Sequence, residues 1–385
     1  MAHTNTVLSQ ILKLVPRHEF EKLSNQHHSG RQFRTASRWS QFTTMLVMQL
    51  SARNSLRDVV ANMFAQAHRL YHLGCAILTK TTLARINQDK PYALYEALFS
   101  RLLSRCMNQS PNHTFRFKNK LISLDSTTID LCLALYPWAE FRQTKGAVKL
   151  HIGLNHDGNL PSVVTVTNGK TTDIEVARSL TFNKGSIVIC DRGYTDYSWY
   201  KTLTDKGIFF VTRLKSNAKY RVIERRTADK AQGLRSDQTI EFTGSQTAKA
   251  CPVSLRRVSY QDPETGKRYV YLTNHFGLSA KTIADIYKQR WQVELFFKWI
   301  KQNLKIKSFI GTSKNAVLTQ IWIAMCAYLI LCYIKFISKA GASMQTILRL
   351  LQLNLFEKRD MQHLINGGSA DIPELNDRQA MLFKS

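Results

Sequence analysis

Three acidic residues, far apart in the chain, are the first candidates for chemistry. Asp125 follows the apolar run 121–124, Asp191 follows the apolar run 186–190, and Glu294 lies among cations in a later stretch. Carboxylate oxygens are the ligands that Mg²⁺ and Mn²⁺ prefer, and such ions assist transfer reactions at phosphate groups. A single Asp after a strand is commonly a turn or cap residue, so the prediction depends on the three acids meeting in space.

Glu294 belongs to the stretch 285–307, which contains no Gly or Pro and is predicted to form one helix. At about 100° per residue, Tyr287, Arg290, Glu294 and Lys301 fall within an arc of about 60° on that helix. The alternative for this window is a solvated helix with an ion pair between Arg290 and Glu294. A second face, suited to packing on a core, carries Ile286, Val293, Phe297, Ile300 and Leu304.

Strand patterns dominate residues 120–214, in the order strand, hairpin, helix, strand, helix, strand. The expected strands are 121–124, 148–155, 160–167, 186–190 and 208–214, and the expected helices are 173–180 and 196–206. This order predicts a mixed α/β sheet whose first and fourth strands lie side by side. Such a sheet would bring Asp125 and Asp191 to one rim.

Three further segments surround this predicted sheet. Helical patterns fill residues 1–118, where 16 Lys and Arg stand against 5 Asp and Glu, a balance that suits recognition of duplex DNA. Within it, residues 79–87 could form a recognition helix that projects Arg85 into a groove, with a basic solvated helix as the alternative. Residues 216–271 are predicted to form an inserted β-rich subdomain, and 341–385 a helical tail that ends in a loop.

Composition narrows the class of partner and the compartment. The chain has 54 Lys and Arg against 27 Asp and Glu, and its net charge of +27 predicts a polyanionic partner, either nucleic acid or an anionic membrane surface. The uncharged run 316–334 is just long enough to span a bilayer. Thr319 and Gln320 interrupt this run, and the preceding helix needs apolar cover, so we expect a buried core helix and no membrane partner.

The cysteines and the N-terminus indicate a cytoplasmic protein. Seven cysteines without a C-x-x-C pair predict free thiols in a reducing compartment, and the first residues lack an apolar signal core. With the excess of basic residues, this favours a cytoplasmic protein that associates with the nucleoid.

Four short motifs together resemble the DDE transposases of insertion-sequence family four. They are D-S-T at 125–127, D-R-G-Y at 191–194, L-T-N at 272–274 and Y-x2-R-x3-E-x6-K at 287–301. The last motif fits at all its positions and is highly specific. The N-terminal S-Q-I-L-K-L-V-P-R-H-E-F also resembles the leading domain of one branch of that family. The resemblance predicts a helical domain at 1–118, a catalytic domain at 119–340 and a tail at 341–385.

The resemblance implies a ribonuclease H-like catalytic core, two Mg²⁺ or Mn²⁺ ions, and a homodimer that bridges two transposon ends and moves the element by cut and paste. It assigns metal ligation to Asp125, Asp191 and Glu294, and contact with double-stranded DNA to Tyr287, Arg290 and Lys301. To the DNA-binding residues we add Lys298, from its place on the helix, and Arg192, from its place beside Asp191. In this family an aromatic residue of the insert holds a flipped base during hairpin formation. Here the insert lacks Trp, so the sequence does not predict which aromatic residue would act.

Two other functions fit the same residues. A metal-dependent nuclease that cuts DNA without strand transfer would use the same three carboxylates. A catalytically inactive DNA-binding regulator would retain the basic helices, although the complete acidic triad argues against it. Terminal inverted repeats with a short target duplication in the flanking DNA would favour the transposase.

Overall fold

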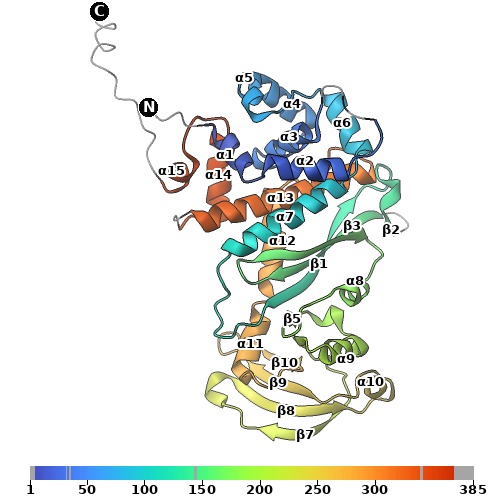
Figure 1. Cartoon of the computed structure of the whole chain (residues 1–385). Helices are drawn as coiled ribbons and strands as arrows, with labels where there is room; N and C mark the ends of the chain where they lie inside the picture. The colour runs from blue at the N-terminus through green and yellow to red at the C-terminus, as the bar shows by residue number, and fades with distance from the viewer. Residues whose placement is uncertain (1–4, 32, 34–35, 143–144, 339–340, 368–385) are drawn as a thin grey trace, which may run out of the picture.

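The computed structural model describes residues 5–31, 33, 36–142, 145–338 and 341–367. A ten-stranded mixed sheet runs through the chain in the order β2-β3-β1-β5-β6-β10-β9-β8-β7, and β4 pairs with β3. Helices from both ends of the sequence gather at one end of the sheet, and the strands of residues 220–273 lie at the other (Figure 1). This is the α/β class that the sequence predicts.

Five strands of the sheet follow a ribonuclease H-like order, β4-β3-β1-β5-β6. They are β1 (Leu121–Leu131), β3 (Lys145–Asn155), β4 (Leu160–Asn168), β5 (Ile187–Ile189) and β6 (Phe209–Arg213). β1 is antiparallel to β3 and parallel to β5, which in turn is parallel to β6. The predicted hairpin and the predicted contact between the first and fourth strands are therefore confirmed.

The β-rich segment continues this sheet rather than forming a sheet of its own. Its strands are β7 (Tyr220–Arg226), β8 (Leu234–Phe242), β9 (Leu255–Gln261) and β10 (Arg268–Thr273). β10 pairs with β6 across Tyr271 to Thr273, so an unbroken ladder connects the segment to β5. Asn274 secures this junction, because its side chain accepts from the Phe210 N–H and donates to Thr204 and Ile208.

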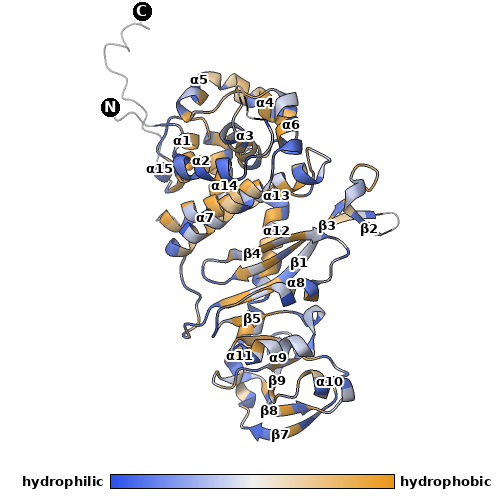
Figure 2. Cartoon of the chain, turned by 45° about the vertical axis from the view of Figure 1, so that its right-hand side comes forward, coloured by the Kyte–Doolittle hydropathy of each residue, from blue (hydrophilic) through white to orange (hydrophobic). Residues whose placement is uncertain are grey.

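The helical end of the molecule has one continuous core. The helices before the sheet are α1 (Val7–Lys13), α2 (Arg17–Gln26), α3 (Arg38–Leu50), α4 (Leu56–Ala65), α5 (Ala67–Leu70), α6 (Lys80–Asp89) and α7 (Ala93–Gln109). α13 (Lys314–Ile337) passes beneath them and contacts α3, α6 and α7. Figure 2 shows the hydrophobic colouring of α13, and 94% of its most apolar window is buried inside the protein. α13 is long and apolar enough for a membrane span, but here it forms the centre of the core.

The stretch predicted as one helix over 285–307 is two helices, α11 (Ala280–Lys288) and α12 (Trp291–Asn303). The prediction was wrong because each helix packs in a different core: Ile286 joins the cluster of β5, β6 and β10, whereas Val293 joins the helical core. A tight turn joins them, in which the N–H of Arg290 donates to the carbonyl of Tyr287 at 3.1 Å. The polar face is therefore shared between two elements.

The remaining elements are α8 (Asp173–Ser179), α9 (Tyr197–Asp205), α10 (Ser245–Ala250), α14 (Met344–Asn354), α15 (Met361–Ile365) and the short β2 (Glu140–Arg142). α8, α9 and α14 lie where the sequence predicts helices. The loop predicted after residue 367 lies outside the described residues.

Candidate active site

Asp125 lies in the middle of β1, not at the end of a strand as predicted. The parallel pairing with β5 stops at Ser123, which is opposite Ile189, but β1 continues to Leu131 because the longer strand β3 supplies an antiparallel partner. Asp125 and Asp191 each follow the last parallel pair by two residues. The register thus places both aspartates beyond the carboxyl end of the same strand pair, where α/β sheets commonly bind ligands.

Helix α12 lies across the face of β1 that carries Asp125 and Thr127. Arg290, at the N-cap of α12, forms an ion pair with Glu294 one turn later and reaches Asp125 with Nη1 3.4 Å from Oδ2. Two turns beyond Glu294, the Lys301 Nζ donates to the Thr127 hydroxyl at 2.5 Å. The helix therefore places one acid and two cations along β1.

Burial and like charges perturb the Asp125 carboxyl. Its side chain is 22% exposed, and burial raises the pKa of Asp125 to about 6. The N–H of Ser126 and the Arg290 guanidinium lower this pKa, whereas the nearby Asp191 and Glu294 add to the rise. A carboxyl whose pKa responds to two other carboxyls shares one electrostatic site with them.

Asp191 opens the tight 3₁₀ turn Arg192–Tyr194 that the D-R-G-Y motif forms. Its Oδ1 accepts a hydrogen bond of 2.8 Å from the N–H of Gly193. A Cβ at position 193 would lie only 3.0 Å from that Oδ1, so glycine permits this close approach. The turn therefore fixes the direction of the Asp191 carboxylate.

The other residues predicted to bind DNA lie at differing distances from the acids. Tyr287 is on α11, where its ring lies under the Arg290 guanidinium at 5.9 Å and packs on Tyr271 at 4.9 Å. Lys298 is exposed on α12 and Arg192 is exposed beside Asp191. Tyr287 is thus joined to the acidic site through Arg290, whereas Lys298 and Arg192 face solvent.

A second polar cluster, which sequence reasoning missed, lies on the opposite face of β1. Asp173, at the start of α8, is 2.9 Å from the Lys149 Nζ and 3.3 Å from the His151 Nδ1. Although burial opposes ionisation, hydrogen bonds from His151, Ser126 and Lys149 hold the pKa of Asp173 well below its usual range. The period-two spacing of Lys149 and His151 was the available signal, because it puts both on one strand face.

The carboxylates of Asp125, Asp191 and Glu294 have the donor chemistry that Mg²⁺ or Mn²⁺ requires. Among the described residues, no group of three acidic, histidine or cysteine side chains already forms a metal cage. Arg290 neutralises Asp125 and Glu294 instead. The three residues therefore fit divalent ions, because all three are carboxylates and Asp125 lies within the electrostatic influence of the other two. Such ions would compete with Arg290 for the carboxylate oxygens.

The strand order and the acids beyond the parallel pair define a ribonuclease H-like α/β core. Residues 116–330 match the family described as Transposase DDE domain, and the chain belongs to that family. Residues 3–76 match a second family, described as Domain of unknown function (DUF4372). This domain family accounts for most of the helices before the sheet.

Three curated relatives carry similar sequences. The chain is 33% identical to "Putative transposase y4zB" of Sinorhizobium fredii over 72% of this chain and 78% of the relative. It is 31% identical to "Probable transposase for insertion sequence element IS5377" of Geobacillus stearothermophilus, over 65% and 66% of the two chains. It is 27% identical to "Putative transposase for insertion sequence element IS4SA" of Synechocystis, over 63% and 69%. The predicted resemblance to insertion-sequence transposases is therefore confirmed.

Proposed function

We propose that this protein binds the terminal inverted repeats of an insertion sequence, cleaves the DNA strands at those ends with divalent metal ions, and joins the freed ends to target DNA. The observation that carries the proposal is the common electrostatic site of Asp125, Asp191 and Glu294 in a member of the DDE transposase family. The names of two relatives, which refer to insertion sequence elements, support the choice of substrate.

Each charged side chain has a distinct part in the proposed reaction. Asp125, Asp191 and Glu294 would hold two Mg²⁺ or Mn²⁺ ions, which supply an activated oxygen nucleophile and stabilise the leaving oxygen. Arg290 neutralises two of these acids in the free protein and is placed to bind a backbone phosphate beside them. Lys301, held on β1 by Thr127, would bind a second phosphate along the strand.

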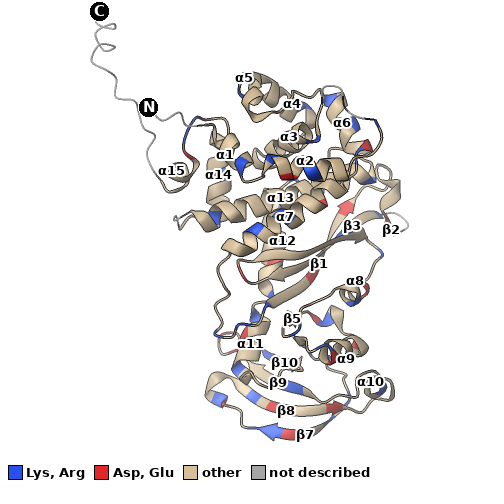
Figure 3. Ribbon diagram, in the orientation of Figure 1, with Lys and Arg blue, Asp and Glu red and all other residues tan. Residues whose placement is uncertain are grey.

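Each part of the chain would have its own role in the proposed reaction, and the distribution of basic residues supports this assignment. The helical domain at 1–118 would bind duplex DNA, the domain at 119–340 would carry the chemistry, and the segment 216–271 would contact the DNA near the cut. Figure 3 shows Lys and Arg on α2 and α6 at one end of the molecule and on β7 and β8 at the other. Two copies, each bound to one transposon end, would act together as a homodimer in the cytoplasm.

The decisive experiment supplies purified protein with labelled DNA that carries the element's own ends, with Mg²⁺ and a target plasmid. We expect end cleavage and joining of the labelled strand to the plasmid. Asp191→Ala and Glu294→Gln should lose both products while gel-shift affinity for the ends is retained. Asp130→Asn is the matched control, because Asp130 is an exposed acid on the same strand.

The products separate the proposed function from its rivals. Cleavage without joined product would indicate a nuclease, and end binding without cleavage would indicate a DNA-binding regulator. Cleavage that persists in Glu294→Gln would refute the metal-binding role of that residue. If all three variants, including the Asp130→Asn control, lost the cleavage seen with wild type, the assay would not distinguish the proposed metal ligands from other acids.

A further inference from the structure

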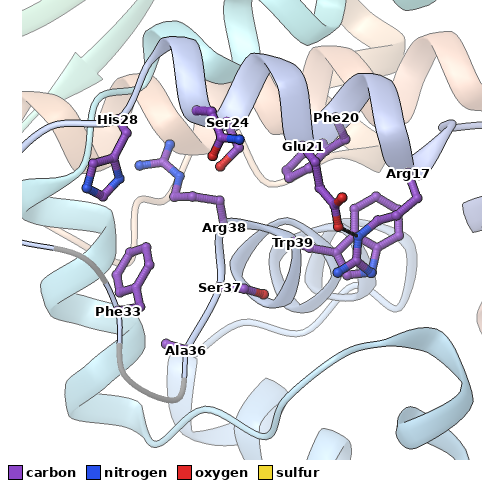
Figure 4. Close-up of a pocket in the computed structure, with 11 residues that line it drawn as sticks. Arg17, Phe20, Glu21, Ser24, His28, Phe33, Ala36, Ser37, Arg38 and Trp39 are labelled. Atoms are coloured by element: carbon purple, nitrogen blue, oxygen red, sulfur yellow. Dashed lines mark hydrogen bonds and ion pairs between the residues drawn. The ribbon is translucent and has the colours of Figure 1, made fainter.

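The region that matches the family of unknown function contains a cavity of about 560 Å³ between α2 and the start of α3. Its walls come from α2, from His28 and Phe33, and from residues 36–39, and Figure 4 shows their arrangement. A cavity of this size matches the volume of typical small-molecule sites. The cavity contains none of the three acids, so a ligand in it would bind at a place separate from the acidic site.

Arg38 lines this cavity with an unusually placed positive charge. Its side chain is buried, with 5% of the residue exposed, and its guanidinium lies over the Tyr95 ring at 5.1 Å. Nη2 donates to the carbonyl of Pro91 at 2.7 Å, but the buried Nε has no hydrogen-bond partner. Among the described residues no Asp or Glu forms an ion pair with Arg38. A buried charge without a counter-charge is costly, so the site favours an anion.

A buried arginine elsewhere in the chain shows the usual arrangement. Arg256 is 3% exposed, and its Nε and Nη2 bind the two carboxylate oxygens of Asp237 at 2.9 and 2.7 Å. Its Nη1 donates to three backbone carbonyls. The contrast shows that the protein pairs one deeply buried guanidinium with an acid and leaves Arg38 without one.

The N-terminus of α3 adds a second source of positive potential at the same place. Ser37 caps the helix by accepting from the Ser40 N–H at 3.0 Å. The N–H groups of Arg38 and Trp39, in the first turn of this 13-residue helix, have no acceptor within the helix. Helix N-termini bind phosphate groups through such N–H groups and the helix dipole.

Aromatic and polar groups complete the wall, and one ion pair lies at its far end. The Arg38 side chain extends toward Ser24 and His28, and Phe33 lies across the opening from it (Figure 4). The rings of His28 and Phe33 form an edge contact at 6.4 Å. At the other end Arg17 is engaged by Glu21. The cavity thus offers a cation without an acidic partner among the described residues at its base and the partly exposed Phe33 ring beside it.

We propose that this cavity binds a phosphate group carried by a nucleotide, with the phosphate at Arg38 and the start of α3 and the base against Phe33. The volume exceeds what an inorganic phosphate alone would fill, and the aromatic rings suit a base. The nucleotide is either free or part of a DNA strand. The inference does not depend on the transposition reaction proposed above, because no acidic residue of that site takes part.

The test is thermal unfolding of the full chain in a chloride buffer, with inorganic phosphate or dAMP added at matched ionic strength. Wild type should melt at higher temperature with phosphate and higher still with dAMP. Arg38→Gln should weaken the affinity for both by at least about tenfold, the loss expected for one charged hydrogen bond. Arg256→Gln is the control: it should melt earlier in every buffer and keep the phosphate response.

A second variant covers the case in which Arg38→Gln fails to fold. Ser24→Phe fills the cavity and leaves the arginine in place, so it should fold and lose the response to dAMP. A wild type that responds no more to phosphate or dAMP than to chloride would overturn the proposal. So would a full response in both cavity variants.

Duplex DNA identifies the source of the phosphate. If a DNA strand occupies the cavity, Arg38→Gln should weaken duplex binding and reduce the slope of log affinity against log salt by about 0.9. If a free nucleotide is the ligand, the duplex affinity of Arg38→Gln should equal that of wild type while dAMP binding is lost. Both results support the phosphate site, and they separate it from the cleavage reaction because neither measures cutting.

Discussion

Replacing Asp125 by Asn should stabilise the metal-free protein although it removes a proposed metal ligand. The pKa of Asp125 is raised from 3.8 to about 6, so the folded chain binds this proton more tightly than the unfolded chain does. The stabilising effect of the proton is complete below pH 3.8 and is lost as the pH rises through 6. At 1.36 kcal/mol per pKa unit, the carboxylate costs about 3 kcal/mol of folding free energy at neutral pH.

The assay is urea unfolding with EDTA at several pH values. Asp125→Asn should be more stable than wild type by up to about 3 kcal/mol at pH 7.5, and this difference should vanish near pH 4. The exposed Asp130→Asn, on the same strand, should show no gain. Equal or lower stability of Asp125→Asn at pH 7.5 would refute the reasoning, because it would mean that Arg290 already compensates the carboxylate fully.

Three further outcomes are expected. Lys301→Ala, which breaks the contact with Thr127, should weaken binding to the transposon ends and lower the salt slope by about 0.9 in gel shifts; an unchanged slope would contradict phosphate contact. Asp237→Asn should lower the free energy of unfolding in urea by about 3–5 kcal/mol, because it leaves Arg256 buried without a charged partner. A decrease below about 1 kcal/mol, the value for an exposed pair, would disprove this. Burial lowers the pKa of His156 from 6.5 to about 4, so the free energy of unfolding of wild type should fall by up to about 3 kcal/mol relative to that of His156→Gln as the pH is lowered from 6.5 to 4.

The sequence was most informative where pattern and topology agree. The alternation of 148–155 and 160–167 around a turn-rich loop predicted the hairpin, and the order of elements predicted that β1 and β5 pair. Right-handed connections leave few topologies for such an order, so the placement of Asp125 and Asp191 near each other followed from chain order.

Features that depend on tertiary contacts could not be predicted. Helical periodicity extends across Gln289, and only the existence of two separate cores breaks the helix there. β1 extends past Asp125 because its partner β3 is long, which the short apolar run 121–124 did not show. That no acid in the described part of the chain forms an ion pair with Arg38 is likewise a property of packing, because basic residues are common throughout the first 118 residues.

The burial of α13 limits how this chain can be divided. Its apolar surface is covered by α3, α6 and α7 on one side and by α12 and the sheet on the other. A fragment that begins at the first strand would expose this surface to water and should aggregate on expression. The leading helices are therefore not an exchangeable module: a hybrid that joins them to another transposase would fold only if the matching long helix came with them.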